Sequence, residues 1–448
     1  MSLTTTETVS EVERKSRSIF RESSSVFAAQ VLMLLAGLLN NFIIAKLGGP
    51  DGKGFIYTLQ LFSSAALIFA NFGIGPAAVY HFRREERFSV EEITAGLLWP
   101  SLLLGCIPLA LLAVLRQTSI AFLHTGVWDS AAPLAFAVVP AFTLVWNLSY
   151  LYLAKGAIGG YNVLRASQQS LFAVLLLGLL LVHITRFRTL VSAWVISVWT
   201  PALLAMIVAG STSGIWKLPS RRFVRRAFAF GWRSHLGAVV QYLQHRADVV
   251  LVLYFLPLRD LGIYSLAVAL AELLLYVPLS VSQVLLPHIA SSEEADADRI
   301  TSAFCRASVF TTALLSLLLA LLATGVVPWL LPAFRQAVPV IWILLPGVVV
   351  ASIFKVLSSD LNGRGMPLKT LFPAAAALVF SVAGCCYAIP RFGMIGAATV
   401  TSLAYLLNAS LYIYSYSRWS SVTARSLVLL QARDLDGYRK LLLSWRRG

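Results

Sequence analysis

The chain has 448 residues, of which 58% are hydrophobic and 12% are charged, and its mean hydropathy is +0.77. Soluble globular domains carry about twice this share of charged residues, so the composition excludes that class and indicates a polytopic membrane protein. The net charge of +16 does not predict nucleic-acid binding, because the basic residues gather in short loops and tails, where membrane topology places them.

Apolar runs bounded by charged residues, Gly or Pro predict an all-α protein with twelve membrane spans. The spans are expected at about 25–46, 55–80, 95–115, 131–154, 168–184, 189–210, 230–256, 261–287, 305–331, 338–358, 367–389 and 393–416. No loop between them is long enough to fold as a domain. Any functional chemistry must therefore lie within the membrane.

Five segments follow from these spans. We expect a cytoplasmic N-terminal segment at 1–24 without a cleavable signal peptide, a first six-helix bundle at 25–210, a basic cytoplasmic linker at 211–229, and a second six-helix bundle at 230–416. Residues 417–448 form a basic tail with apolar stretches, which favours an amphipathic helix on anionic headgroups. A disordered basic tail is the alternative.

The distribution of Lys and Arg predicts the orientation. With twelve spans, 27 of the 36 basic residues fall on the side of the two termini and 8 on the opposite side. Positive residues are retained on the cytoplasmic side. Both termini of this multi-pass protein are therefore expected in the cytoplasm.

The two halves show signs of an internal repeat. A shift of 207 residues brings Pro50 onto Pro257 and Tyr57 onto Tyr264, and it places Asn41 on Asp248. Six spans return the chain to its starting side, so the two halves would have the same orientation, related by an axis along the membrane normal.

Cofactor and metal chemistry find no support in the sequence. The chain has no GxxxxGK[ST] loop, its six histidines are scattered, and its four cysteines lie in apolar runs without paired spacing. We therefore expect no cofactor, no metal and no catalytic residue, and we interpret the cysteines as small packing residues.

The stretch from 228 to 290 carries ionisable residues inside predicted spans. Arg246 and Asp248 lie in the seventh span and Glu272 lies near the centre of the eighth. A charge at that depth costs at least ~2.5 kcal/mol, so such residues normally face a partner or a hydrated cavity. At 100° per residue, Arg246 shares a helix face with Tyr242 and His235, whereas Asp248 points to the roughly opposite face.

Two roles are open for these groups. A cavity-facing Arg246 could bind a phosphate, and the carboxylates Asp248 and Glu272 could exchange a proton or coordinate sodium. The alternative is that they close static interhelical ion pairs.

Other polar residues are weaker candidates. Asn41 and Tyr57 could line the same cavity, but such side chains also hold membrane helices together. Four basic residues lie near predicted cytoplasmic helix ends, where they could form a mouth for an anionic headgroup or extend to lipid headgroups: Arg165, Arg233, Lys355 and Arg364.

Three blocks of the sequence resemble a known family. They are residues 41–84 with the turn LGGP followed by GFIY, residues 245–290 with Arg-x-Asp followed by LGIY and a closing Leu-Pro, and residues 360–367 with the sequence DLNGRGMP. This pattern is similar to the polysaccharide or O-antigen flippases of the multidrug/oligosaccharidyl-lipid/polysaccharide exporter superfamily, and the resemblance covers nearly the whole chain.

The resemblance implies two six-helix bundles around a central cavity that opens alternately to either side. Its expected substrate is a lipid-linked oligosaccharide with an anionic diphosphate headgroup, moved for polysaccharide or lipopolysaccharide synthesis. In that reading Arg246 is a cavity cation for the diphosphate, and Asp248 is a lining or coupling acid. Expected partners are membrane lipids, coupling H⁺ or Na⁺, and a polysaccharide polymerase and glycosyltransferases.

Two other functions stay open. The first is a drug/cation antiporter of the same superfamily, but that function calls for a deep acid in the first six spans, which contain none. The second is a membrane glycosyltransferase or polysaccharide polymerase, which normally needs an acidic motif on a sizeable outer loop. The outer loops here are short, so the sequence favours a transporter of an anionic substrate over an enzyme.

Overall fold

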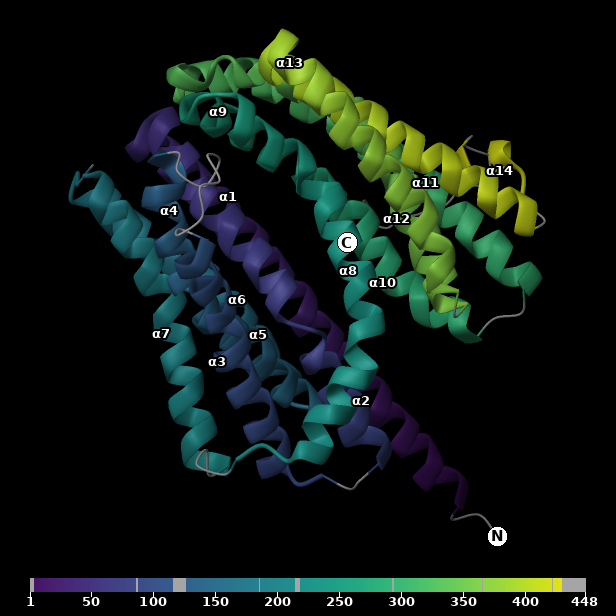
Figure 1. The fold of residues 1–448 in the computed structure, drawn as a ribbon. Coiled ribbons are helices and arrows are strands. Elements are labelled where there is room, and N and C mark those ends of the chain that lie inside the picture. The colour runs from purple at the N-terminus through teal and green to yellow at the C-terminus, as the bar shows by residue number, and fades with distance from the viewer. Residues whose placement is uncertain are drawn as a thin grey trace. The chain divides into compact units, whose positions relative to one another are not determined.

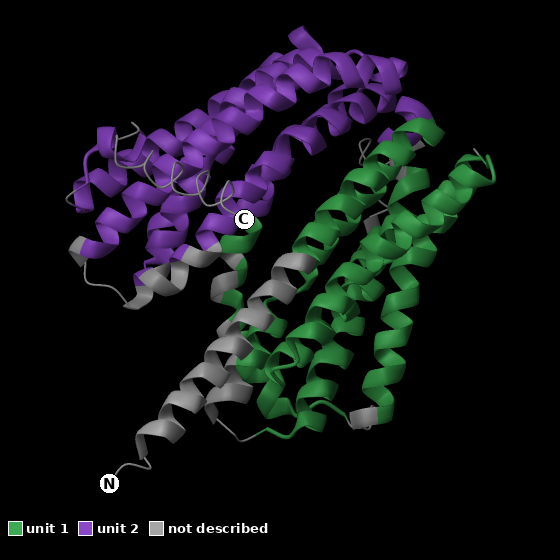
Figure 2. Cartoon of the chain, turned by 180° about the vertical axis from the view of Figure 1, so that it is seen from behind, with its two compact units in different colours: residues 1–48, 55–239 green, residues 49–54, 240–448 purple. Residues whose placement is uncertain are grey.

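The computed structural model describes residues 4–85, 88–115, 126–184, 186–213, 218–291, 294–364, 366–420 and 422–428. Every regular element within these ranges is a helix (Figure 1). The chain divides into two compact units, coloured separately in Figure 2: unit 1 comprises 1–48 and 55–239, and unit 2 comprises 49–54 and 240–448. Each unit is described on its own below.

Unit 1 is organised around one central helix. Helix α5 packs against α2, α3, α6 and α7, and its most apolar stretch is more buried than that of the neighbouring spans. The helices of the unit are α1 (Thr4–Ala70), α2 (Ile74–Glu85), α3 (Val90–Leu115), α4 (Gly126–Ala137), α5 (Val139–Ala154), α6 (Ile158–Leu181), α7 (Phe187–Ser213) and the first part of α8 (Arg221–Phe255).

Unit 2 repeats this plan. Its central helix, α12, packs against α9, α10, α11 and α13. Its helices are the rest of α8, α9 (Leu258–Glu272), η2 (Leu273–Leu275), α10 (Tyr276–Ser291), α11 (Glu294–Leu330), η3 (Pro332–Phe334), α12 (Ala337–Gly363), η4 (Pro367–Thr370), α13 (Leu371–Trp419) and α14 (Ala424–Val428). The central helix belongs to the fourth predicted span in unit 1 and to the tenth in unit 2. The two positions are six spans apart, as an internal repeat of six spans requires.

Two glycines divide long helices into pairs of spans. Gly49 in α1 has φ 61° and Gly393 in α13 has φ 57°, conformations that residues with a Cβ rarely adopt. Pro50 follows Gly49 directly and restarts the helix, because a proline at the first helical position loses no hydrogen bond. The chain thus reverses across the membrane with almost no loop.

Nine helical stretches in the described part are long and apolar enough to cross a membrane. Two of them contain the kinks at Gly49 and Gly393 and so supply two spans each, and α8, whose polar residues lower its hydropathy, supplies one more. The predicted all-α fold with twelve spans is therefore confirmed. The central cavity between the bundles stays a prediction.

The segment 49–54 is held in unit 2 by a close helix crossing. A Cβ on Gly262 of α9 would overlap the carbonyl oxygen of Pro50, and one on Gly54 would overlap the carbonyl oxygen of Leu258. Backbone atoms cannot move aside as a flexible side chain can, so only glycine fits at both positions. This contact links the start of the second span to the start of the eighth.

The ends of the predicted segments differ in detail from the helices. Helix α1 begins at Thr4, within the expected N-terminal segment, and α8 begins at Arg221, within the expected linker. Most of the expected C-terminal tail, from residue 429 onward, lies outside the described residues.

Candidate functional site: an ionic centre in unit 2

A two-point ion pair joins α8 to α9 inside unit 2. The Arg246 guanidinium donates to both carboxylate oxygens of Glu272, at 3.0 and 3.3 Å. Both side chains keep 28% of their surface exposed. The fork geometry is the arrangement by which arginine also binds phosphates. A partly exposed pair of this kind can exchange its carboxylate for another anion.

Asp248 lies two residues further along α8 and has separate partners. Its Oδ2 accepts hydrogen bonds from the Tyr264 hydroxyl at 2.6 Å and from the Thr401 hydroxyl at 3.0 Å. The residue is only 5% exposed. This carboxylate ties α8 to α9 and α13, and it does not pair with Arg246.

A lysine–histidine contact lies next to the ion pair. The Lys355 ammonium of α12 is 2.7 Å from Nε2 of His245, the residue before Arg246. The His245 ring also meets the Tyr405 ring edge-on, with centroids 6.2 Å apart. The centre therefore gathers three nitrogen-bearing side chains around one carboxylate.

A second ionic cluster lies at the C-terminal end of α12, beyond Lys355. Arg364 donates to Asp298 at 2.8 Å and to the Tyr416 hydroxyl at 3.0 Å, and its Nε lies 2.9 Å from Asp360 as an ion pair. Asp360 accepts from the Thr301 hydroxyl at 2.8 Å. Burial acts to lower the pKa of Arg364, but Tyr416, Asp360 and Asp298 outweigh it and raise that pKa, so the guanidinium stays charged. The cluster joins α11, α12 and α13 and accounts for Arg364 without a substrate.

Three further predicted site residues lie in unit 1: Arg165, Asn41 and Tyr57. In unit 1 the Arg165 guanidinium lies 3.7 Å from the centre of the Trp146 ring, a cation–π contact. Asn41 donates to the Gly37 carbonyl of its own helix at 2.8 Å, and Tyr57 is half-buried on α1. Tyr242 is half-buried on α8 in unit 2.

His235 and Arg233 lie in the part of α8 that belongs to unit 1. The His235 ring stacks on Phe72, with centroids 5.1 Å apart. Phe72 stands at the break between α1 and α2 with φ 45°, a conformation that is uncommon for a bulky residue. The Arg233 side chain lies outside the described side chains.

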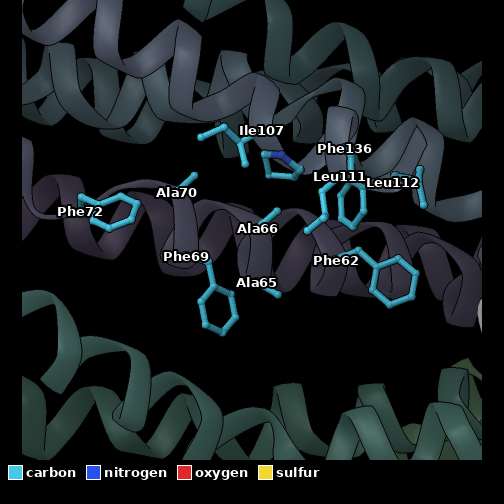
Figure 3. Close-up of a pocket in the computed structure, with 11 residues that line it drawn as sticks. Phe62, Ala65, Ala66, Phe69, Ala70, Phe72, Ile107, Leu111, Leu112 and Phe136 are labelled. Carbon is cyan, nitrogen blue, oxygen red and sulfur yellow. The ribbon is translucent and has the colours of Figure 1, made fainter. Parts of the chain in front are cut away.

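Unit 1 also contains an apolar pocket of about 490 Å³ (Figure 3). It is lined by side chains of α1, α3 and α4 and by Phe72, and the rings of Phe62, Phe69 and Phe136 are among them (Figure 3). Its surface offers almost no polar atom. Such a pocket suits a hydrocarbon chain and gives nothing that could hold a charged headgroup.

Metal binding gains no support from the described residues. No group of three or more His, Cys, Asp or Glu side chains there is arranged to hold an ion. The four cysteines are free thiols, with Cys305 and Cys385 buried.

Sequence reasoning missed the pairing of Lys355 with His245. Lys355 lies near the end of a predicted span, where extension to lipid headgroups is the default interpretation. His245 is adjacent to Arg246, so its position next to a charged residue in a span was the available signal. Tyr264 and Thr401, the partners of Asp248, are not next to a charged residue in the sequence, so no comparable signal pointed to them.

Comparison with known proteins places this geometry in a family. A family model described as polysaccharide biosynthesis protein matches residues 19–293, more than half of the chain. The chain belongs to the polysaccharide biosynthesis protein family. An uncharacterized membrane protein of Methanocaldococcus jannaschii is 28% identical over 199 residues, which cover 42% of this chain and 38% of that protein. The chain thus spans well under half the length of that relative.

Two solved structures share the fold of this family member. A lipid II flippase, MurJ, in an inward closed conformation has a TM-score of 0.66 at 14% identity, covering 87% of each chain. An inward-facing multidrug resistance transporter of the MATE family in the MOP superfamily has a TM-score of 0.68 at 12% identity, covering 86% of this chain and 94% of that one. The predicted resemblance to a polysaccharide family is confirmed by the family match, and the protein is a multi-pass membrane protein that shares the fold of these two structures.

Proposed function

We propose that the protein is a flippase that moves a lipid-linked oligosaccharide, carried on a polyprenyl diphosphate, from the cytoplasmic to the outer leaflet of the inner membrane. Alternating access of the two units would carry the headgroup while the polyprenyl chain stays in lipid. The observation that carries the proposal is the Arg246–Glu272 pair, a partly exposed fork of charges between two membrane helices.

The chemistry of the pair supports an anionic substrate. A phosphate offers the Arg246 guanidinium the same two-oxygen contact as Glu272. In a low-dielectric surrounding a guanidinium gains most from a partner of full negative charge. The family name, polysaccharide biosynthesis protein, supports a sugar-bearing substrate.

Two acids of unit 2, Glu272 and Asp248, supply a route to energy coupling. Glu272 would lose its partner when a phosphate binds Arg246, and it would then be free to take up a cation. Asp248, held by Tyr264 and Thr401, is a second carboxylate in the same unit. We therefore assign coupling to H⁺ or Na⁺ to these two residues, with both termini of the chain in the cytoplasm.

An antiporter for cationic drugs is the competing function, and the buried Asp248 carboxylate is the observation that favours it. In the described spans of unit 1, however, the acids Glu91, Glu92 and Asp129 all stand in the first turn of a helix. A cationic substrate would find no carboxylate at mid-depth there.

The test is flipping of a fluorescent polyprenyl-diphosphate sugar in proteoliposomes, followed by quenching of the outer leaflet. Arg246→Ala should slow flipping by at least about tenfold, since a charge-assisted contact is worth about 1.5–3 kcal/mol. Arg391→Ala is the matched control. Arg391 is exposed, and its guanidinium donates to the Tyr387 carbonyl one turn earlier on the same helix. Equal rates for the Arg246 variant and the control would refute the proposal, and inhibition of the wild type by cationic drugs instead of diphosphates would favour the antiporter.

A further inference from the structure

Lys355 is a half-buried cation that contacts an imidazole. Its ammonium contacts His245 Nε2 at 2.7 Å. Within the described ranges no carboxylate lies within the 4.0 Å of an ion pair with it. Ammonium groups withdrawn from water are normally paired with an acid, because their desolvation is costly. The position therefore carries positive charge that the unit does not neutralise directly.

The hydrogen bonds of His245 show a second group in this position that lacks a partner oxygen. An ammonium can only donate, so Nε2 must be the acceptor and the ring proton must sit on Nδ1. That Nδ1 is buried and meets no acceptor in the described part of the chain. A buried donor without an acceptor costs about 1–3 kcal/mol. The His245 N–H and the Lys355 ammonium thus both call for an oxygen ligand.

The two residues adjoin the proposed phosphate site. His245 precedes Arg246 on α8, and the charge of Arg246 acts on the His245 ring. Glu272, the partner of Arg246, also acts electrostatically on Lys355. Two fixed cations therefore share one carboxylate, which leaves a net charge of about one unit for an anion to neutralise.

We propose that Lys355, positioned by His245, is the ligand of a second phosphate beside the one held by Arg246. The pair then makes the site selective for a diphosphate ester over a monophosphate ester. This inference rests on the proposed function, because it takes Arg246 as the ligand of the first phosphate. The remaining two N–H bonds of Lys355 donate to the second phosphate.

Binding of farnesyl diphosphate and farnesyl phosphate to the purified full chain tests this assignment. The wild type should prefer the diphosphate by at least about tenfold, the equivalent of one charge-assisted contact. Lys355→Met should weaken diphosphate binding by about the same factor and leave monophosphate binding within about twofold. Lys355→Arg should keep most of the preference, because it keeps the positive charge.

Lys369→Met is the matched control, since Lys369 is exposed and lies over the Trp419 ring at the end of unit 2. His245→Gln keeps the Lys355 ammonium and should lower the preference by a smaller factor; it serves as the second variant if Lys355→Met does not fold.

Each result decides between the two proposals. Equal weakening of both probes by Lys355→Met, or unchanged binding of both, overturns the second-phosphate assignment. If Arg246→Gln still weakens binding in those cases, the proposed function stands without it. If neither variant changes the binding of either probe, both proposals fail.

Discussion

Arg364 offers the most quantitative test of how unit 2 is held together. Its side chain is 8% exposed and contacts Asp298, which is 11% exposed, and Asp360, which is fully buried. Replacing Arg364 with Met removes the positive charge but keeps an unbranched chain of similar bulk. Two carboxylates would then remain close together, beside the donating hydroxyls of Thr301 and Tyr416.

The expected loss of stability follows from the cost of an uncompensated buried charge. Removal of one partner of a buried ion pair typically costs about 3–5 kcal/mol. We expect Arg364→Met to lower the apparent Tm of the purified protein by on the order of 10 °C. Arg364→Lys should cost less, because it keeps the charge and loses only the fork.

Thermal unfolding in detergent, followed by tryptophan fluorescence, measures both values. Arg391→Met provides the exposed-arginine control and should leave Tm within about 1–2 °C. The double variant Arg364→Met/Asp360→Asn should regain part of the lost stability, since it removes one of the stranded charges. If Arg364→Met has the same Tm as the Arg391→Met control, the ion pairs of Arg364 give no net stabilisation and this prediction is wrong.

Two further substitutions test contacts inside unit 2. Gly262→Ala should destabilise the protein by about 1–3 kcal/mol or more, because its Cβ would meet a backbone carbonyl, whereas Gly178→Ala, with open space around it, should be neutral or stabilising in the same melting assay. Tyr264→Phe should cost about 1.5–3 kcal/mol by removing the shortest hydrogen bond to Asp248, and the exposed Tyr414→Phe serves as its control; equal melting of the two tyrosine variants would show that the Asp248 carboxylate does not need this donor.

Hydropathy located the spans well, but it misjudged where some of them end. The tenth span is predicted to end at 358, within the polar run Ser358-Ser359-Asp360, yet α12 continues to Gly363. Asp360 can stay within the helix because the Thr301 hydroxyl donates to its Oδ1 and the Arg364 guanidinium offsets its charge. A reading of one span at a time cannot anticipate partners that come from other helices.

The turn between the first two spans shows a similar limit. Lys53 counts as a loop residue in the sequence, but in the structure it is 1% exposed. Gly49 reverses the chain within one residue and Pro50 restarts the helix at once, so no loop is left to hold Lys53 in water. The Gly-Pro signal was present in the sequence, and the depth of the lysine depends on packing against α9.

The pairing of charges was the least predictable part of the candidate site. Helical periodicity separates Arg246 from Asp248 on opposite faces of α8, but it does not fix how α8 and α9 rotate about their axes. That rotation decides that Arg246 meets Glu272, 26 residues away, while Asp248 meets Tyr264 and Thr401.

Helix α8 belongs to both units, since the division falls after Val239 without a proline to interrupt its backbone. His235 stacks on Phe72 in unit 1, and Arg246 pairs with Glu272 in unit 2. His235 and Arg246 are eleven residues apart on α8, which is about 16 Å along the helix axis. One continuous helix therefore carries the aromatic stack of unit 1 and the ionic centre of unit 2.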